Sequence, residues 1–338
     1  MRAGRHPASL PFLALMLGAS LCGPVHASPS KSPAAVGSEA IPSWLRPHVG
    51  TGEDQIAPVV LSRARSLYRR KVSEGAVRNP CYFAMDATRP SRMSDGTPGD
   101  RFYIVCEAQR SFRAISSGHG SGRKLPGLAD FSNSAECARN FGNAQDSELT
   151  AGGDYVTSEA KTSFKGYYRS PGRGYEPFVR DFVQFEGEGE TANARARAIG
   201  GHAAVVLKGV CLRKKPDSPY ANAEGYVPSG TLIDYAGGRS NGCTSWAAAD
   251  AETIVSMLRS QPTSLYIYPQ AADIEAVARA VATHKAPADA GSYWNATCLK
   301  KIGAPKFWRK EQLEPIIARY RSEHPAPPPR PIPLCTAE

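Results

Sequence analysis

One cysteine stands in a setting that could make its thiol a nucleophile. Cys243 follows the glycine-rich run 237–242 and directly precedes a segment of helical character over 247–259. Glycine lets a backbone turn sharply and approach a substrate closely, and the N-terminus of a nearby helix stabilises a thiolate. Free backbone N–H groups in such a turn can bind an oxyanion. The same spacing fits a cysteine that forms a disulfide beside a loop, so spacing alone leaves both interpretations open.

A thiol nucleophile needs a base, and three histidines are candidates. His202 follows a glycine pair and opens a β-prone run, whereas His119 lies in a loop between glycines. His284 ends a predicted helix, where the helix dipole alone can account for a surface histidine. The residues therefore rank His202 first, His119 second and His284 third.

The N-terminus is typical of an exported protein of the cell envelope or periplasm. Basic residues precede an apolar run over 10–22, and a small-x-small cleavage signature ends at Ala27. The run is shorter than a comfortable membrane span, and no later stretch has the roughly 20 apolar residues that a span needs. We expect a signal peptide over 1–27 and no stable membrane span; a retained N-terminal anchor is the alternative.

The number of cysteines bears on whether Cys243 is a free thiol or part of a disulfide. Removing the signal peptide leaves seven of the eight cysteines, an odd number in a compartment that favours disulfides. At least one thiol must stay unpaired, and we predict that it is Cys243. No C-x-x-C pair exists, which argues against zinc and against a thioredoxin-like redox site. The predicted disulfides are Cys81–Cys106, Cys298–Cys335 and, by elimination, Cys137–Cys211.

The pattern of apolar and turn-forming residues predicts a mainly β domain with peripheral helices. Short β-prone runs alternate with glycine-rich turns from about residue 80 to residue 270, and helical patterns lie before, within and after this region. The predicted organisation is a signal peptide (1–27), a flexible linker (28–55), an N-terminal helix (56–79), a catalytic domain (80–270), and a helical and proline-rich C-terminal extension (271–338).

Net charge adds a hint about the partner. The chain has 41 Lys and Arg against 31 Asp and Glu, a formal net charge of +10. A basic exported protein suggests an anionic partner, although a basic surface can also serve solubility alone. No zinc-finger spacing, RNP-like aromatic motif or lysine-rich tail indicates nucleic acid. An anionic cell-wall polymer fits the compartment better.

Two linked motifs resemble one known family. The pattern N-A-x-x-R-x-I-x-x-H over 193–202, followed by G-R-S-x-G-C over 238–243, is similar to the murein L,D-transpeptidase catalytic-domain family. The glycine pattern over 118–122, the turn 131–133 and the strand-like run 153–157 also look like that family. The resemblance covers roughly residues 80–270 and implies an L,D-transpeptidase-like β-sandwich.

The resemblance also implies a mechanism on peptidoglycan stem peptides. His202 takes the proton of Cys243, whose thiolate attacks the carbonyl of a bond between the L-centre of a diamino acid and D-alanine. Backbone N–H groups around Gly242 and Cys243 hold the oxyanion. An amine of a second stem resolves the thioester, or water does so in an L,D-carboxypeptidase. No cofactor or metal is required.

The loop before the nucleophile supplies the expected substrate-binding residues. These are Arg239, Ser240 and Asn241. The guanidinium of Arg239 could pair with a stem carboxylate in a bidentate manner, or it could instead form a structural ion pair within the turn.

Departures from the family pattern keep other functions open. Residues 208–233 separate His202 from Cys243 more widely than the family suggests, and we interpret them as an inserted loop near the site. A papain-like peptidase or amidase would instead use Cys243 with His284, and Asn295 would orient the imidazole. A non-catalytic wall-binding protein with an inert Cys243 is the third possibility.

Overall fold

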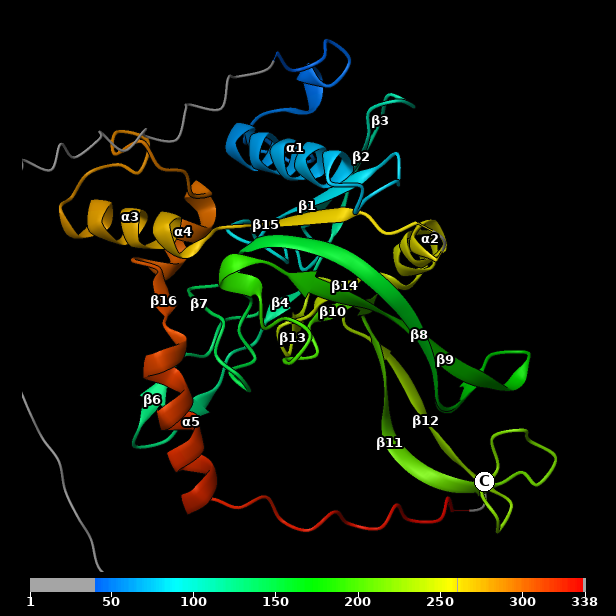
Figure 1. Cartoon of the computed structure of the whole chain (residues 1–338). Helices are drawn as coiled ribbons and strands as arrows, with labels where there is room; N and C mark the ends of the chain where they lie inside the picture. The colour runs from blue at the N-terminus through cyan, green and yellow to red at the C-terminus, as the bar shows by residue number, and fades with distance from the viewer. Residues whose placement is uncertain (1–39, 260, 337–338) are drawn as a thin grey trace, which may run out of the picture. The chain divides into compact units, whose positions relative to one another are not determined.

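The computed structural model describes residues 40–259 and 261–336 (Figure 1). The predicted signal peptide and residues 28–39 of the predicted linker lie outside this part of the chain. The described residues form a mainly β structure with helices at its periphery, as the sequence predicts. None of their helices is long and apolar enough to cross a membrane.

The structure gives the following bounds for the helices and strands. The helices are α1 (Pro58–Ser73), α2 (Ala248–Leu258), α3 (Ala271–Ala282), α4 (Ala296–Ile302) and α5 (Lys310–Glu323), with short 3₁₀ turns at Arg46–His48 and Gly189–Thr191. The large sheet contains β1 (Tyr82–Asp86), β2 (Asp100–Cys106), β3 (Ser111–Ser116), β8 (Gly153–Ser170), β9 (Gly174–Gly187), β10 (Gly200–Ala203), β11 (Val205–Lys214), β12 (Tyr226–Asp234), β14 (Thr244–Trp246) and β15 (Ser264–Tyr268). The short strands are β4 (His119–Gly120), β5 (Lys124–Leu125), β6 (Ala129–Asp130), β7 (Asn140–Gly142), β13 (Arg239–Ser240) and β16 (Lys306–Trp308).

Hydrogen bonding joins the long strands into one mixed sheet in the order β14-β10-β9-β8-β15-β1-β2-β3. The β1–β15 and β10–β14 pairs are parallel, whereas β8–β9 and the β1–β2–β3 run are antiparallel. Strand β14 is therefore at one edge of the sheet, directly beside β10. This pairing places the segment after Cys243 next to the strand that carries His202.

The centre of the sheet is buried on both faces, which explains its apolar sequence. Every residue of β1 and β15 is buried. Side chains alternate between two clusters: Tyr82 and Ala84 pack with α1, whereas Phe83 and Met85 enter the larger core that α2 and α3 cover. The helices thus cover both faces of the sheet, and this packing fixes the positions of β10 and β14 at its edge.

The described part of the predicted flexible linker packs on the domain instead. Leu45 is fully buried, and the guanidinium of Arg89 donates hydrogen bonds to the carbonyl oxygens of Gly52 and Gln55. The proline- and glycine-rich composition suggested flexibility, but the segment contributes apolar residues that α1 and the sheet bury. Residues 40–55 are therefore packed against the domain.

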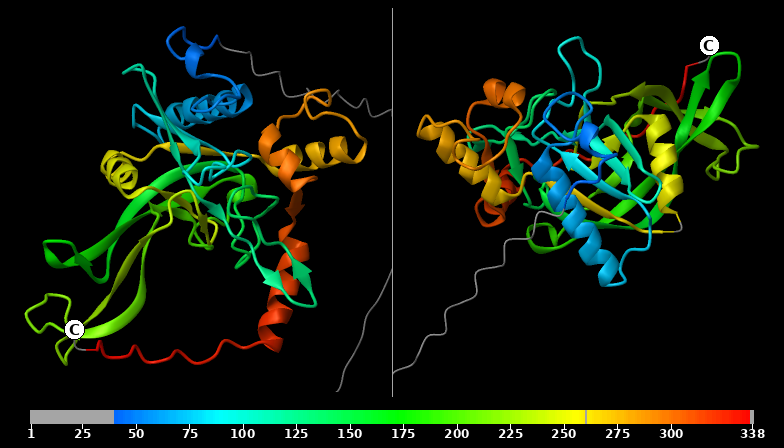
Figure 2. Two further views of the ribbon diagram at one scale, coloured as in Figure 1. Left: turned by 180° about the vertical axis from the view of Figure 1, so that it is seen from behind. Right: turned by 90° about the horizontal axis from the view of Figure 1, so that it is seen from above.

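The predicted inserted loop 208–233 is a β-hairpin for most of its length. Strands β11 and β12 pair antiparallel, with an irregularity between Lys208 and Cys211. The C-terminal tail runs from the end of α5 to this hairpin (Figures 1 and 2). There the backbone N–H of Leu212 donates to Pro333 O at 2.7 Å, and Cys335 N–H donates to Leu212 O at 2.9 Å. The tail is thus attached at both ends.

Three disulfides form, as predicted, but two of the predicted pairings were wrong. The Cys81–Cys106 bridge is confirmed. The other bridges are Cys137–Cys298 and Cys211–Cys335. Helix α4 packs beside the turn that carries Cys137, and the tail returns to the hairpin that carries Cys211. Sequence spacing cannot show either of these long-range contacts.

Candidate active site

The turn before Cys243 is held in a conformation that requires glycine. Gly242 has a φ of 102°, and a Cβ there would lie 2.9 Å from the carbonyl oxygen of Leu149 and 3.0 Å from Cδ1 of Ile199. The hydroxyl of Ser240 donates to the carbonyl oxygen of Cys243 and closes the turn. Ser240 is buried and its hydroxyl is engaged within the turn, and the residue also lines a cavity together with Arg239 and Asn241.

Cys243 is the free cysteine of the described chain, which confirms the parity prediction. The thiol is half-buried and donates to the carbonyl oxygen of Ala198 at 3.6 Å. Burial raises the pKa of Cys243, and the backbone N–H of Gly200 and the charges of Arg180 and Arg197 only partly oppose it. At neutral pH the resting group is therefore a thiol.

The prediction that Cys243 directly precedes a helix was wrong. Strand β14 begins at the next residue, and α2 begins only at Ala248. The sequence 244–246 pairs with β10 because Trp246 packs into the core against Phe102. The helix N-terminus is thus separated from the thiol by a strand and cannot act on it as closely as the sequence suggested.

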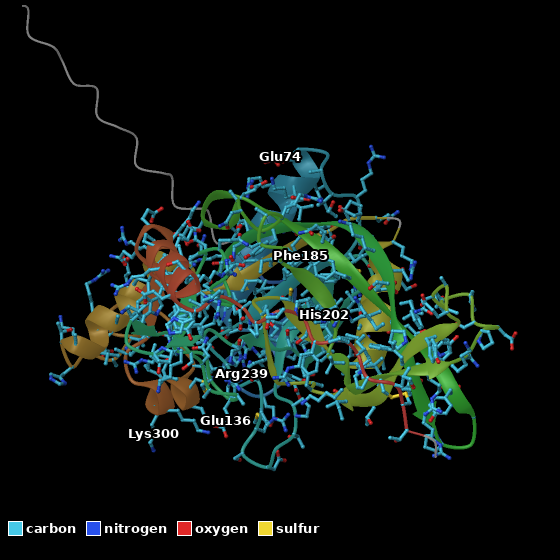
Figure 3. All side chains as sticks on the ribbon, turned by 90° about the horizontal axis from the view of Figure 1, so that it is seen from below. Glu74, Glu136, Phe185, His202, Arg239 and Lys300 are labelled. Carbon is cyan, nitrogen blue, oxygen red and sulfur yellow. A yellow bond between two sulfur atoms is a disulfide. The ribbon has the colours of Figure 1, made fainter. Side chains whose placement is uncertain are left out.

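His202 lies on β10, the strand that pairs with the segment after Cys243. In the parallel β10–β14 pair, His202 is in register with Ser245. Cys243 stands two residues before Ser245, in the turn that leads into β14, and the backbone N–H of Gly200, two residues before His202, acts on its thiol. Figure 3 shows His202 together with Arg239, seen from below. The ring of Phe182 stacks on His202 with centroids 6.3 Å apart.

One hydrogen bond fixes the tautomer of His202. Its Nδ1 lies 2.8 Å from the carbonyl oxygen of Ala203. A carbonyl oxygen can only accept, so Nδ1 carries the proton and Nε2 keeps a lone pair. Nε2 has no hydrogen-bond partner within residues 40–259 and 261–336. Burial lowers the pKa of His202, and the charges of Arg180 and Lys165 lower it further. The imidazole is neutral and available as a base.

The resting thiol is hydrogen-bonded to Ala198 and not to His202. Both groups are neutral, because burial raises one pKa and lowers the other. Catalytic hydrogen bonds often form only when substrate is bound. A neutral thiol and a neutral imidazole are the forms that general-base activation would require, and they differ from a preformed thiolate–imidazolium pair.

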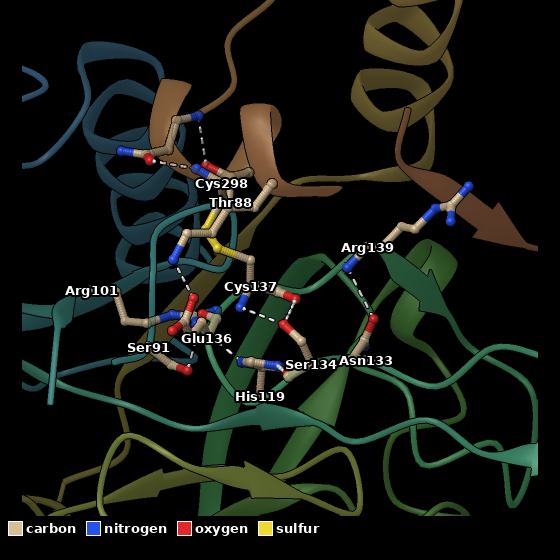
Figure 4. Close-up of a disulfide and its surroundings, with 12 residues drawn as sticks. Thr88, Ser91, Arg101, His119, Asn133, Ser134, Glu136, Cys137, Arg139 and Cys298 are labelled. Atoms are coloured by element: carbon tan, nitrogen blue, oxygen red, sulfur yellow. Dashed lines mark hydrogen bonds and ion pairs between the residues drawn. A yellow bond between two sulfur atoms is a disulfide. The ribbon is translucent and has the colours of Figure 1, made fainter. Parts of the chain in front are cut away.

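His119, the second candidate base, forms hydrogen bonds through both ring nitrogens (Figure 4). Nδ1 accepts from Arg101 at 3.2 Å, and Nε2 donates to the carbonyl oxygen of Ser134 at 3.0 Å. Burial lowers the pKa of His119 to about 3, and the charge of Arg101 contributes. This histidine supports strand β4, which pairs with β13 at Arg239.

The residues of the papain-like alternative do not surround the nucleophile. His284 follows the C-terminus of α3 and is exposed. The side chain of Asn295 caps α4 by accepting a hydrogen bond from the backbone N–H of Cys298. Neither residue lines the cavity that contains Cys243.

Two polar cavities meet at Asn241. The first has a volume of about 300 Å³ and is lined by Cys243 together with Arg123, Arg197 and Arg321. The second, of about 590 Å³, is also lined by Asn241, together with Arg239. The guanidinium of Arg239 donates to the carbonyl oxygen of Asn133 at 2.9 Å, so one of its N–H groups is used structurally. Arg239 and Asn241 are thus placed to contact a bound molecule.

Sequence reasoning missed the arginines around the thiol. Arg197 is half-buried and donates to the carbonyl oxygen of Leu149 at 2.7 Å, and its charge acts to lower the pKa of Cys243. Its place in the 193–202 motif was a usable signal. Arg123 and Arg321 come from distant segments with no motif of their own, so only the fold identifies them.

Backbone donors complete the geometry. Across the described ranges, no protein acceptor takes the N–H of Gly242 or Cys243. These groups are therefore free to bind a developing oxyanion. The same ranges contain no cluster of histidine, cysteine, aspartate and glutamate side chains that could hold a metal ion.

Comparison with known proteins identifies no relative of this chain. No protein-family model, no curated protein and no solved structure matches it. Any assignment of function therefore depends on the residues of the site and on the two sequence motifs.

Proposed function

We propose that the chain is a cysteine acyltransferase of the L,D-transpeptidase type that acts on peptidoglycan stem peptides. The observations that support this proposal are the free thiol of Cys243, directly before β14, and the neutral imidazole of His202 on the neighbouring strand β10. The residues match the two motifs that resemble that family, and we infer that residues 80–270 form its catalytic domain. Three disulfides agree with an exported protein, and we propose the cell envelope as its location.

The first half of the reaction forms a thioester. Nε2 of His202 takes the proton of Cys243 while Sγ attacks the carbonyl carbon between the diamino acid and D-alanine. The N–H groups of Gly242 and Cys243 bind the oxyanion. When the tetrahedral intermediate collapses, the C–N bond breaks and His202 returns the proton to the leaving amine of D-alanine.

The second half transfers the acyl group. The amine of a second stem attacks the thioester, and His202 takes its proton. The C–S bond breaks, the thiol of Cys243 is regenerated, and a peptide cross-link remains. If water takes the place of the amine, the product is a shortened stem and the enzyme is an L,D-carboxypeptidase.

Mass analysis of muropeptides incubated with the purified mature protein tests the proposal. We expect cross-linked dimers that have lost D-alanine, or tripeptide stems if water is the acceptor. A carbapenem should also form a covalent adduct that maps to Cys243. Unchanged muropeptides and an unmodified Cys243, under conditions that acylate a known L,D-transpeptidase, would leave a non-catalytic wall-binding protein as the better explanation.

A further inference from the structure

Arginines form much of the wall of the cavity that contains Cys243, and one of them comes from the C-terminal extension. Arg123 lies in the segment after β4, Arg197 precedes β10, and Arg321 is in the last turn of α5. Two carboxylates, those of Asp146 and Glu148, share the cavity with them. A small cavity beside a nucleophile with an excess of guanidinium groups fits an anionic group of a substrate.

Helix α5 is fixed against the cavity. Leu313 and Ile317 are buried in a cluster with Leu149. The carboxylate of Glu314 accepts a hydrogen bond from the backbone N–H of Gln145 at 2.9 Å. Ile317 and Arg321 are four residues apart on the helix and share its face. Packing of α5 therefore holds the guanidinium of Arg321 at the cavity wall.

The arginines at the mouth of the cavity have weak or replaceable partners. Arg321 forms an ion pair with Asp146, and both side chains are partly exposed. The nearest carboxylate to Arg123 is that of Glu148, at 4.0 Å, which is the limit of an ion pair. Oε2 of Glu148 instead accepts from the hydroxyl of Ser121 at 2.8 Å. Arg123 therefore lacks a close charged partner in the described chain.

The loop that supplies Asp146 is strained. Asp146 and Glu148 both have a φ of 59°, in the left-handed region that residues other than glycine seldom adopt. Such strain is concentrated at ligand-binding and active sites, where surrounding structure maintains it. In this loop the carboxylate of Asp146 pairs with the guanidinium of Arg321. A carboxylate of a bound substrate would form the same kind of ion pair.

We propose that Arg321 and Arg123 bind the carboxylate of the residue that leaves the substrate, and that Asp146 holds Arg321 until the substrate displaces it. The inference rests on the proposed function. The carboxylate of D-alanine lies within about one residue length, roughly 3.5 Å, of the bond that is cut. It therefore falls in the cavity that Cys243 lines. The C-terminal extension thus selects stems that end one residue after the scissile bond.

D-Alanine release from two matched donors tests the assignment: a tetrapeptide stem with a free C-terminal carboxylate and the same stem with a C-terminal carboxamide. The mature wild-type chain should prefer the carboxylate about tenfold in kcat/KM, the size of one charge-assisted hydrogen bond. Arg321→Gln should lose this preference, because the KM for the carboxylate donor should rise about tenfold. Arg319→Gln is the matched control, because Arg319 pairs with Glu323 on the same helix.

Asp146→Asn separates binding from structure. Asparagine tolerates positive φ, so this variant should fold and should lower the KM for the carboxylate donor several-fold. If Asp146→Asn instead raises KM as Arg321→Gln does, the ion pair is structural and the inference fails. Equal use of both donors by wild type and Arg321→Gln also overturns it, while the proposed function stands. Failure of wild type to release D-alanine from either donor overturns both.

Discussion

Two buried histidines lie close to the loop of Cys243, and they differ in one respect that decides what each can do. His119 uses both ring nitrogens, one toward Arg101 and one toward Ser134. His202 uses only Nδ1, toward Ala203, and leaves Nε2 without a partner in the described residues. Both are less than a tenth exposed, and burial lowers the pKa of each. A base is therefore recognised by an uncommitted nitrogen, and not by burial or a shifted pKa.

The difference arises from what surrounds each ring. His119 belongs to the short strand β4, which is packed between Arg101 and the turn over 131–142. His202 belongs to β10, whose neighbours on the same face are Phe182 and Ser245. An aromatic ring and a small side chain leave the imidazole edge open, whereas an arginine and a carbonyl oxygen occupy it.

Removal of the nucleophile should have the largest effect and tests the premise of the comparison. Cys243→Ala should abolish thioester formation and all stem-peptide processing, because no acyl intermediate can form without the thiol. The fold should persist, since Cys243 forms no disulfide. Intact mass and muropeptide analysis give the readout. Processing retained by this variant would show that the chemistry lies elsewhere.

Substitution by glutamine should lower the acylation rate at one histidine and not at the other. His202→Gln should lower the acylation rate about 10²–10⁴-fold, the usual contribution of a general base. His119→Gln should leave the rate of the folded protein nearly unchanged, because a glutamine amide can accept from Arg101 and donate to Ser134. Stopped-flow acylation by a carbapenem measures both.

A control keeps this comparison fair. The Arg101 charge is fully buried, so the thermal stability of the His119 variant should be measured beside its rate. The wild-type rate should fall at acidic pH, because a protonated His202 cannot take a proton, and the fall should be centred below the ordinary histidine range because burial lowers the pKa of His202. A rate lost in His119→Gln and kept in His202→Gln would reverse the assignment.

Stability against pH should separate the histidines further. The pKa of His119 falls from 6.5 to about 3 on folding. The unfolded chain therefore binds a proton that the folded chain excludes, and stability is lost as the pH drops from about 6.5 toward 3. Denaturant midpoints should show a shallower decline in His119→Gln than in wild type over this range. Parallel declines would mean that His119 remains exposed to protons in the folded state.

Local patterns predicted the secondary structure around the site well, because short-range periodicity determines it. The strands at Phe83 and Ile267 and the helices at Ile254 and Ile317 all lie within the predicted segments. The prediction that a helix directly follows Cys243 was wrong because Trp246 is buried in the core and its segment pairs with β10 as a strand. Tertiary packing there overrides the local pattern.

Contacts between segments that are far apart in the chain could not be predicted from the sequence. The partners of Cys137 and Cys211 depend on where α4 and the tail return to the domain. The cavity depends on Arg321, which is 78 positions beyond Cys243 in the printed numbering. Nothing in the local sequence of α5 marks this arginine among its neighbours. A motif can identify a nucleophile and a base, whereas substrate contacts from other elements require the fold.

The smallest expected effects belong to the residues of the papain-like alternative. His284→Ala should change the acylation rate by less than about twofold, because this exposed histidine does not line the cavity of Cys243. Asn295→Ala should also leave the rate unchanged but lower the free energy of unfolding by about 1 kcal/mol, the usual cost of losing an N-cap. Urea unfolding measured beside acylation separates the two properties. A fall in the acylation rate of both variants, with stability unaffected, would place the base at the end of α3 and would end the assignment of His202.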